Sequence, residues 1–316
     1  MNIFTTPVFL ETAGELYFPG RRKRIEVCRL EGRRLPMLVL DDDEVVGAMN
    51  FYDFPQPLDD AKGAIDREIL WLPRTVIETT TVAERTVELP RGKQHAPYIA
   101  WTALPSFAAF EADWKARGAV KPNDSARQRR RIEKEIGPLK FEFDDQRSEV
   151  FDACVTWKSA QYRASGYVDM FANPVNVQLF KKLQERGALL VSSLFAGDTL
   201  MAVHFGATND RRLGSWIPAY DVAFQKYSPG RLLLEDMLKA SHARGDLEFD
   251  FLIGNEAYKF QFATHSRVIG EVGSPPVAHL IKTKARLRAK AFLEDNPKAR
   301  EWFQKIRALA PGPKPK

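Results

Sequence analysis

The segment from Tyr220 to Phe262 places the narrowest limits on the fold, because it predicts a strand end, a loop, a helix, a strand and a short helix in succession. Ser228 and Pro229 precede apolar residues at helical spacing, which predicts a helix with Ser228 as its N-cap and Gly245 at its end. Alternation over 247–252 then predicts a strand. A strand, a helix and a second strand of this length form a βαβ unit, so the fold should be α/β.

The start of this predicted helix is suited to binding an anion. The amides of Gly230 and Arg231 fall in its first turn, at the positive end of the helix dipole. Gly230 has no side chain that would block an incoming group, so Ser228, Gly230 and Arg231 are candidate phosphate ligands. The alternative is that Ser-Pro-Gly acts only as a helix cap.

A second candidate site follows the predicted strand. If Asn255 caps the short helix, Glu256 and Lys259 lie three residues apart on one helix face. That face would lie at the carboxyl end of the sheet, where open α/β sheets bind ligands. The alternative is a solvated ion pair of little energetic weight.

Four sequence segments carry a resemblance to a known family. They are His204-Phe205-Gly206, Trp216-Ile217-Pro218-Ala219-Tyr220-Asp221, Tyr227-Ser228-Pro229-Gly230, and Phe249-Asp250-Phe251-Leu252 followed by Gly254-Asn255-Glu256, Tyr258 and Lys259. From Ser125 to Val272 the chain resembles the GNAT-superfamily branch of cellulose-biosynthesis (CelD-like) acyltransferases. That branch is related to the Fem-type enzymes that add amino acids to peptidoglycan precursors.

The resemblance implies an α/β (α+β) fold of two acyl-CoA N-acyltransferase (GNAT)-like domains, with mixed central sheets flanked by helices and a degenerate N-terminal domain. It also implies that the pyrophosphate of acyl-CoA binds at Ser228 to Arg231. The chain lacks the Q/R-x-x-G-x-G/A loop that is usual at this point. The predicted division is 1–121 as the degenerate domain, 122–138 as a basic connecting helix, 139–279 as the acyltransferase domain, and 280–316 as a basic helix and disordered tail.

The predicted reaction is transfer of an acyl group from acyl-CoA to an amine on a sugar, polysaccharide or cell-envelope precursor, as in exopolysaccharide biosynthesis. A thioester is already activated, so the amine attacks it directly and the protein aligns the reactants and takes up a proton. Glu256 is the candidate base or amine-orienting group, and His204 is the alternative base unless it is a hydrogen-bonded core histidine. Tyr220 is the candidate proton donor to the leaving thiolate. We expect Lys259 and Asp221 to contact the acceptor, and no metal is expected.

The predicted connecting helix over 126–136 is strongly basic. Arg127, Arg130 and Arg131 share one face, and Arg130 and Arg131 are candidate ligands of an anionic substrate or coenzyme. The alternative is an exposed helix that only connects the domains.

Other apolar segments predict short strands in the N-terminal region, from Val8 onward. The predicted strands are 25–30, 35–40, 44–51, 69–72, 76–82 and 97–103. An amphipathic helix is predicted over 106–117, a strand over 139–143, helices near 151–164 and 177–186, and a three-strand meander over 189–218.

The charge balance favours anionic partners, because the net charge is +6 and the isoelectric point is about 9.2. Coenzyme phosphates, lipid-linked precursors, tRNA and anionic membranes all meet this description. No apolar run is long enough to span a bilayer, and Cys28 and Cys154 form no metal-ligand cluster, so they are expected to be buried. We expect a cytoplasmic protein whose basic C-terminal helix either contacts the inner face of the membrane or packs on the protein.

Two other functions are compatible with the sequence. An aminoacyl-tRNA-dependent transferase of the Fem type would use the basic helix to bind tRNA, although the chain lacks the long coiled-coil insertion of some of those enzymes. A non-catalytic scaffold or binding protein is the third possibility, and the missing glycine-rich loop is its main support.

Overall fold

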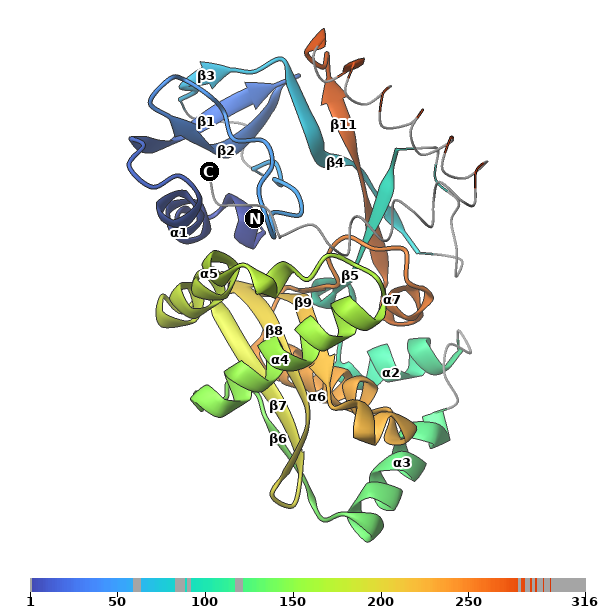
Figure 1. Cartoon of the computed structure of the whole chain (residues 1–316). Coiled ribbons are helices and arrows are strands. Elements are labelled where there is room, and N and C mark those ends of the chain that lie inside the picture. Colours follow the sequence, from blue (N-terminus) through green and yellow to red (C-terminus); the bar gives the residue numbers. More distant parts are fainter. Residues whose placement is uncertain are drawn as a thin grey trace.

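The computed structural model describes residues 2–58, 64–82, 89, 92–116 and 122–277, together with 280, 281, 285, 288, 292 and 296. Apart from those last six residues, the predicted C-terminal helix and tail over 280–316 lie outside the described part (Figure 1). In chain order the elements are η1 (Ile3–Thr5), α1 (Pro7–Tyr17), β1 (Lys23–Leu30), β2 (Arg33–Leu40), β3 (Arg67–Glu68), β4 (Trp71–Thr81), β5 (Gln94–Ala100), η2 (Trp101–Ala103), α2 (Phe107–Ala116), α3 (Pro122–Glu135), β6 (Leu139–Glu142), α4 (Ser148–Ala164), η3 (Met170–Ala172), α5 (Pro174–Glu185), β7 (Leu189–Ala196), β8 (Thr199–Asn209), β9 (Arg212–Tyr220), η4 (Val222–Tyr227), α6 (Pro229–Arg244), β10 (Glu248–Asp250), α7 (Ala257–Phe262) and β11 (His265–Gly273).

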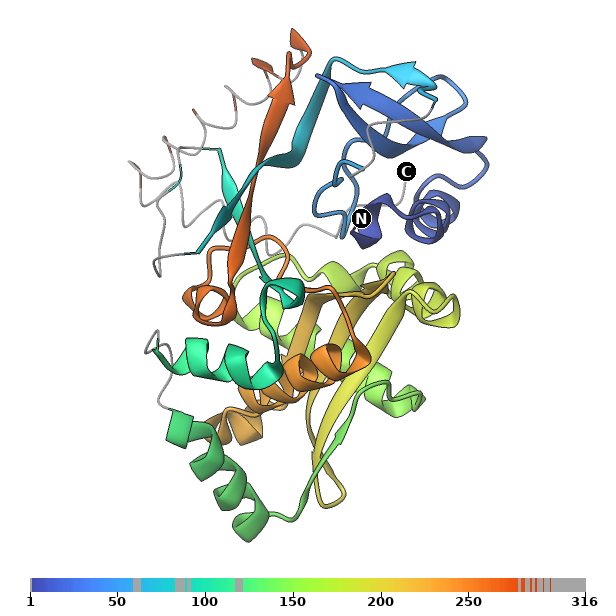
Figure 2. The same ribbon diagram turned by 180° about the vertical axis from the view of Figure 1, so that it is seen from behind.

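An eight-stranded mixed sheet in the order β4-β11-β5-β10-β9-β8-β7-β6 runs through the molecule. Its neighbouring strands pair antiparallel except β9 and β10, which are parallel. Helices α4 and α5 cover one face of β7, β8 and β9, and α6 covers the other (Figures 1 and 2). The predicted mixed α/β fold, with a central sheet flanked by helices, is confirmed.

The two faces of this sheet bury separate apolar cores, because successive side chains of a strand point to opposite faces. Val203 and Phe205 of β8 pack into the core that contains Phe180 of α5. Ala202 of the same strand packs into the core that contains Leu232 of α6. Burial of these helix faces fixes where α6 begins relative to the end of β9.

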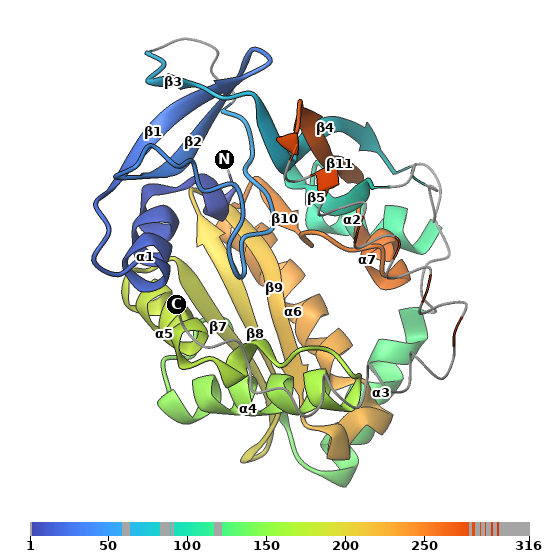
Figure 3. The same cartoon turned by 45° about the horizontal axis from the view of Figure 1, so that its top comes forward.

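A smaller sheet in the order β2-β1-β3 lies with α1 above β7 and β8 in Figure 3 and beside β4 and β11 of the larger sheet. The strands predicted over 25–30 and 35–40 are confirmed as the hairpin of β1 and β2, which are joined at Glu31 and Gly32; both residues have a positive φ, as a tight hairpin turn requires. The predicted strand over 44–51 is wrong. Only an isolated bridge between Val39 and Val45 forms there, and the chain then runs irregularly to the end of the described segment at residue 58.

The prediction that the strands begin at Val8 is also wrong, because residues 7–17 form α1. The Thr6 side chain accepts a hydrogen bond from the Phe9 amide, and Pro7 occupies the first helical turn. This Thr-Pro pair is the same kind of helix start that was recognised at Ser228 and Pro229. The predicted strands over 69–72 and 76–82 are largely one strand, β4, which tolerates Pro73 because β4 is at the edge of the sheet.

The order predicted for the C-terminal half is confirmed. Two helices, a three-strand meander, a helix, a strand, a helix and a strand follow β6 in that order. The last strand, β11, pairs with β4 and β5, so the larger sheet continues from the C-terminal half into the N-terminal half. Among the described residues no helix is long and apolar enough to cross a membrane.

Candidate active site

The parallel strands β9 and β10 separate at their carboxyl ends. They pair only from Arg212 to Gly214 with Glu248 to Asp250, and β9 then continues to Tyr220. The chain after β10 follows β5 instead, because the Phe251 amide donates to the Pro97 carbonyl at 2.9 Å. From Ser215 onward the edge of β9 therefore does not pair with β10. This open edge is at the carboxyl end of the two parallel strands, where ligands bind in α/β sheets.

The start of α6 lies next to the end of β9. Ser228 occupies the N-cap position as predicted, but the expected side-chain cap is wrong, since Ser228 is in the left-handed region with φ 54° and makes no such bond. Its carbonyl accepts hydrogen bonds from the amides of Arg231 and Leu232. A Cβ at Gly230 would lie 3.6 Å from Cδ1 of Tyr220. The fold thus brings Tyr220, Ser228 and Gly230 together.

Two cationic side chains lie over Tyr227, the residue before Ser228. The guanidinium of Arg131 is 5.1 Å from the centre of the Tyr227 ring, and Lys226 Nζ is 4.7 Å from it. The Tyr227 hydroxyl donates to Glu135, which also pairs with Arg131 at 2.8 Å. Arg131 therefore lies over the residue that precedes the N-cap of α6.

The connecting helix α3 docks on α6 through Arg129, which sequence analysis missed. Its guanidinium makes paired hydrogen bonds of 2.9 and 3.0 Å with the Asp236 carboxylate, and a third of 3.1 Å with the Leu232 carbonyl. The sequence signal for this contact is spacing: Ser125, Arg129 and Ile132 are four and three residues apart, which places them on one helix face. In the structure Ser125 and Ile132 are buried on that face. Arg130 is exposed on the other side.

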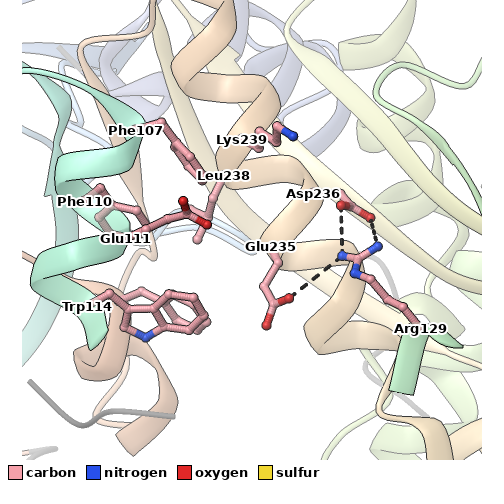
Figure 4. Close-up of a pocket in the computed structure, with 10 residues that line it drawn as sticks. Phe107, Phe110, Glu111, Trp114, Arg129, Glu235, Asp236, Leu238 and Lys239 are labelled. Atoms are coloured by element: carbon pink, nitrogen blue, oxygen red, sulfur yellow. Dashed lines mark hydrogen bonds and ion pairs between the residues drawn. The ribbon is translucent and has the colours of Figure 1, made fainter. Parts of the chain in front are cut away.

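A pocket of about 370 Å³ opens between α2, α3, α6 and α7 (Figure 4). Its lining residues are Phe107, Phe110, Glu111, Trp114, Arg129, Glu235, Asp236, Leu238, Lys239 and Phe262. Figure 4 shows the aromatic side chains of α2 on one side and the Arg129–Asp236 pair on the other. Burial raises the pKa of Glu235. Because carboxylates outnumber cations in the lining, this pocket is a poor site for a pyrophosphate.

The predicted ion pair between Glu256 and Lys259 is confirmed, with Glu256 Oε2 3.1 Å from Lys259 Nζ. Lys259 is only 7% exposed and also donates to the Ile253 carbonyl at 2.8 Å, whereas the Glu256 side chain is 58% exposed. The prediction that Asn255 caps α7 is wrong. Glu256 is at the N-cap position, and Asn255 Oδ1 accepts the amide proton of His95, which ties the loop to β5.

Gly254 permits this arrangement. Its φ of 152° is rarely adopted by residues with a side chain, and a Cβ at this position would overlap Glu256 Oε2 and Lys259 Nζ. The two charged groups therefore fold back over the bare Cα of Gly254. A side chain at this position would displace both charged ends from where they lie.

Three further polar residues lie near this ion pair, and sequence analysis missed them. Burial raises the pKa of Asp53 to about 6, although Arg74, the Ile253 backbone and Lys259 lower it. Burial also raises the pKa of Tyr162, and the charge of Asp53 adds to that shift. Lys158 Nζ donates to the Pro218 carbonyl at 3.1 Å, and burial lowers the pKa of Lys158. Neither spacing nor motif links these residues to Glu256, because they come from distant parts of the chain.

The structure shows local partners for His204 and Asp221. His204 is 3% exposed, its Nε2 is 2.8 Å from Ser215 Oγ, and burial lowers its pKa to about 3. It is therefore neutral at physiological pH and is the hydrogen-bonded core histidine that sequence analysis gave as the alternative. Asp221 caps η4 by accepting the Ala223 amide proton at 2.9 Å.

The two cysteines are expected to resist alkylation in the native protein. Both are fully buried, and burial raises the pKa of Cys28 to about 11 and that of Cys154 even more. Since the thiolate is the nucleophile, native protein should take up less than about a tenth of the iodoacetamide label taken up in urea. Intact mass measures the label, and rapid native labelling of either thiol would contradict the burial described.

Comparisons with known proteins agree with this architecture. Residues 121–260 match the acetyltransferase (GNAT) domain family. A search of curated proteins found no match. Among solved structures, FemX covers 89% of this chain and 94% of its own, with a TM-score of 0.51 and 9% identity. The C-terminal domain of a putative lysylphosphatidylglycerol synthetase from Agrobacterium fabrum covers 88% and 95%, with a TM-score of 0.46 and 11% identity.

A tandem GNAT protein from the clavulanic acid biosynthesis pathway is also similar, covering 86% of this chain and 95% of its own, with a TM-score of 0.36 and 9% identity. At these identities the likeness to solved structures concerns the fold. The family match contains α3 to β10 and therefore the separated strands, the start of α6 and Glu256 with Lys259. Residues 121–260 are therefore similar to an acetyltransferase (GNAT) domain, and the chain shares its overall fold with FemX.

Proposed function

We propose that the protein is an N-acyltransferase that transfers an acyl group from acyl-CoA to an amine on a sugar, polysaccharide or cell-envelope precursor. The observation that carries this proposal is the separation of β9 from β10 beside the start of α6. A thioester lying along the open edge of β9 would have its pyrophosphate at the positive end of a helix. The finer assignment to the CelD-like branch and to exopolysaccharide biosynthesis belongs to this proposal.

In the proposed complex, Ser228, Gly230 and Arg231 hold the pyrophosphate, and Arg131 adds positive charge nearby. Tyr220, beside Gly230, is placed to donate a proton to the leaving thiolate. Tyr220 ends β9. Glu256 and Lys259 follow β10, the other of the two separated strands, and would act together with Tyr220. Glu256 is accessible enough to orient an amine.

Roles on the acceptor side follow from charge and exposure. Lys259 is held by Glu256 and by the Ile253 carbonyl, so it supports the loop and offers its charge to an anionic part of the acceptor. Asp221 and Arg130 are proposed acceptor ligands as well, and both are at least partly exposed. Contact with an anionic membrane at the cytoplasmic side would bring a lipid-linked precursor to this site.

A second candidate function is aminoacyl transfer from aminoacyl-tRNA. The observation in its favour is the FemX-like fold over most of the chain, combined with exposed arginines on α3 and the net charge of +6. A polyanion such as tRNA binds to surfaces of this kind. Absorbance at 260 nm carried through purification and removed by ribonuclease would favour this function.

Calorimetric titration with acetyl-CoA and a longer acyl-CoA tests the donor, using the parent and Gly230→Asp. A Cβ at Gly230 makes only an ordinary contact, so the variant should fold. Its carboxylate should repel the pyrophosphate and weaken binding about tenfold or more, because like charges a few ångströms apart near a protein surface cost on the order of 1–4 kcal/mol.

The matched control is Ala108→Asp, which adds the same charge to the first turn of α2, at an exposed position. It should bind like the parent. Equal binding by parent and Gly230→Asp would reject the phosphate site. If the parent binds no acyl-CoA at millimolar concentration, the acyl-CoA function is rejected in favour of an aminoacyl-tRNA donor or a scaffold.

A further inference from the structure

We propose that Lys158 of α4 binds the carbonyl oxygen of the thioester and stabilises the negative charge that develops there during acyl transfer. The inference rests on the proposed function, because it needs a thioester on the open edge of β9, and it adds a catalytic residue to that function. The observations that carry it are the hydrogen bond between Lys158 and Pro218, the direction of the Pro218 carbonyl group and the surroundings of the Lys158 ammonium group.

The strand register turns the carbonyl group of Pro218 toward the open edge of β9. The Asp221 amide donates to the Met201 carbonyl at 3.1 Å, where β9 ends beside β8. Successive residue pairs of an antiparallel ladder alternate between hydrogen-bonded and non-hydrogen-bonded pairs. Counted back from Asp221, Tyr220 and Pro218 are at non-hydrogen-bonded positions opposite β8. Their main-chain groups therefore point to the other edge of β9, which β10 leaves unpaired.

Proline at position 218 fits this direction and removes one donor from the edge. Proline has no N–H, so within a sheet it occurs where its nitrogen faces an edge. Pro218 is exposed, although its neighbours Ile217 and Ala219 are only 4% and 2% exposed. The edge is therefore accessible to a ligand at this point, but residue 218 offers that ligand no amide proton.

Lys158 supplies a donor at the same point. It lies one turn after Cys154 on α4, the helix that packs on β9, and its Nζ donates to the Pro218 carbonyl at 3.1 Å. Nζ is also 5.3 Å from the centre of the Tyr162 ring. An ammonium group has three N–H donors, and the bond to Pro218 uses one of them. The remaining donors can bind a ligand that lies on this edge.

The charge of Lys158 is not neutralised within the described part of the chain. It forms no ion pair there, whereas Lys259 is paired with Glu256 at 3.1 Å. A partly buried cation without a counter-ion is unfavourable, and burial lowers the pKa of Lys158 for this reason. A negative charge that forms on the adjacent edge would pair with it. The titratable groups that face Lys158 are Cys154, Tyr162, His204, Glu256 and Lys259.

The intermediate of acyl transfer has such a negative charge. The amine nitrogen forms a bond to the thioester carbonyl carbon, and the π electrons of the carbonyl group move to its oxygen, which accepts a hydrogen bond from Lys158. The carbonyl group re-forms as the carbon–sulfur bond breaks, and the thiolate of coenzyme A takes a proton from Tyr220, its proposed donor. The nitrogen loses one proton to solvent, and Tyr220 regains one from solvent. Lys158 keeps its own protons, and the products are an amide and free coenzyme A.

A binding experiment tests the contact without an acceptor. S-carboxymethyl-CoA and S-acetonyl-CoA both carry a carbonyl group one methylene beyond the sulfur, but only the first is negatively charged there. In calorimetric titrations we expect the parent to prefer the carboxylate. Lys158→Met should lower this preference about tenfold or more, because a hydrogen bond to a charged group is lost. Lys158→Arg should retain most of it.

The pH dependence of this preference identifies the cation. In the parent, the preference should fall as the pH rises through the pKa of Lys158, which lies below the ordinary lysine value of 10.5. Arginine stays charged at such a pH, so Lys158→Arg should keep its preference. The same pH profile in the parent and in Lys158→Arg would overturn the assignment.

Turnover tests whether the contact is catalytic. Thiol release from acetyl-CoA is measured with hydroxylamine, a small amine that is largely neutral at pH 7, above the rate without protein. Lys158→Met should lower kcat about 10²–10³-fold, as the loss of one donor to an oxyanion does. Its affinity for acetyl-CoA should change less than about threefold, because the negative charge forms only after the amine attacks.

Lys181→Met is the matched control. Lys181 is an exposed lysine of α5, and its Nζ is 5.4 Å from the Phe151 ring centre and 3.7 Å from Asp152 Oδ1. This variant also removes a lysine that lies over an aromatic ring, but from a helix that packs on β7, and it should behave like the parent.

The melting temperature separates catalysis from support of the fold. Lys158→Met should melt at or above the temperature of the parent, since it removes a partly buried charge that has no counter-ion. A lower melting temperature together with equal losses of kcat and acetyl-CoA affinity would show that Lys158 only ties α4 to β9, and would overturn the proposal.

The remaining outcomes are also decisive. An unchanged probe preference or an unchanged kcat in Lys158→Met would reject the role of Lys158. If the parent binds acetyl-CoA but releases no thiol with hydroxylamine, the catalytic role fails while the donor site stands. If the parent binds no acyl-CoA at all, the proposed function fails and the role of Lys158 fails with it.

Discussion

Replacing Gly254 with alanine is expected to slow the proposed acyl transfer while leaving the fold and donor binding intact. The added methyl group would overlap both Glu256 and Lys259, and the backbone conformation of φ 152° disfavours any side chain. The ion pair must therefore move away, and the orientation of the acceptor moves with it. We expect kcat/KM to fall by about 10²-fold or more, as misplacement of a reacting group by about 1 Å does.

Gly166→Ala is the matched control for this experiment. Gly166 also has a positive φ, of 69°, but nothing lies within 4 Å of a Cβ placed there. It follows α4 and places a side chain at a positive φ without the overlap. Comparable activity losses in the two variants would show that strain alone is responsible and that the packing of the Glu256–Lys259 pair is unimportant.

Replacing Arg267 with methionine is expected to lower the free energy of unfolding by about 3–5 kcal/mol, the cost of removing one partner from a buried ion pair. Arg267 is 3% exposed, pairs with Asp250 at 3.0 Å and Glu248 at 2.5 Å, and lies over the Tyr98 ring at 3.9 Å. Methionine keeps much of the apolar packing but leaves the Asp250 carboxylate buried without its counter-charge. Urea denaturation followed by circular dichroism measures this loss.

Arg127→Met removes an exposed arginine that pairs with Asp124 at 3.0 Å, and is the control. Exposed pairs of this kind contribute about 0–1 kcal/mol. A similar small effect for Arg267→Met would contradict the view that β11 is held to β10 across the sheet by a buried charge network. Arg267 is also the residue through which β11 contacts the strand that carries the Glu256 loop.

The start of α6 and the Glu256–Lys259 pair were predictable because their signals are local. A Pro after a cap position, apolar residues at helical spacing and charges three residues apart act within one or two helical turns. The errors at these sites are also local. Ser228 adopts a left-handed conformation, and Asn255 bonds to β5, so neither side chain makes the cap that its residue type favours.

The N-terminal half was predicted less well, because its pattern of short apolar segments resembles strands wherever they occur. Residues 44–51 are apolar enough for a strand, but Val46 packs into the core, with Met49 and Phe51 against it, without a partner strand. A strand requires a neighbour that supplies hydrogen bonds, and the sequence does not say whether one is near. The helix start at Thr6 and Pro7 is a local signal of the same kind as Ser228 and Pro229.

Residue order along the chain was sufficient for the mixed α/β architecture, the helix start beside β9 and the pairing of Glu256 with Lys259, since each depends on interactions between near neighbours. The approach of Lys158 to Pro218 and of Arg129 to Asp236 depends on the tertiary fold. These contacts join residues from different elements, and they exist only after the burial of aromatic and aliphatic side chains has set the relative positions of those elements.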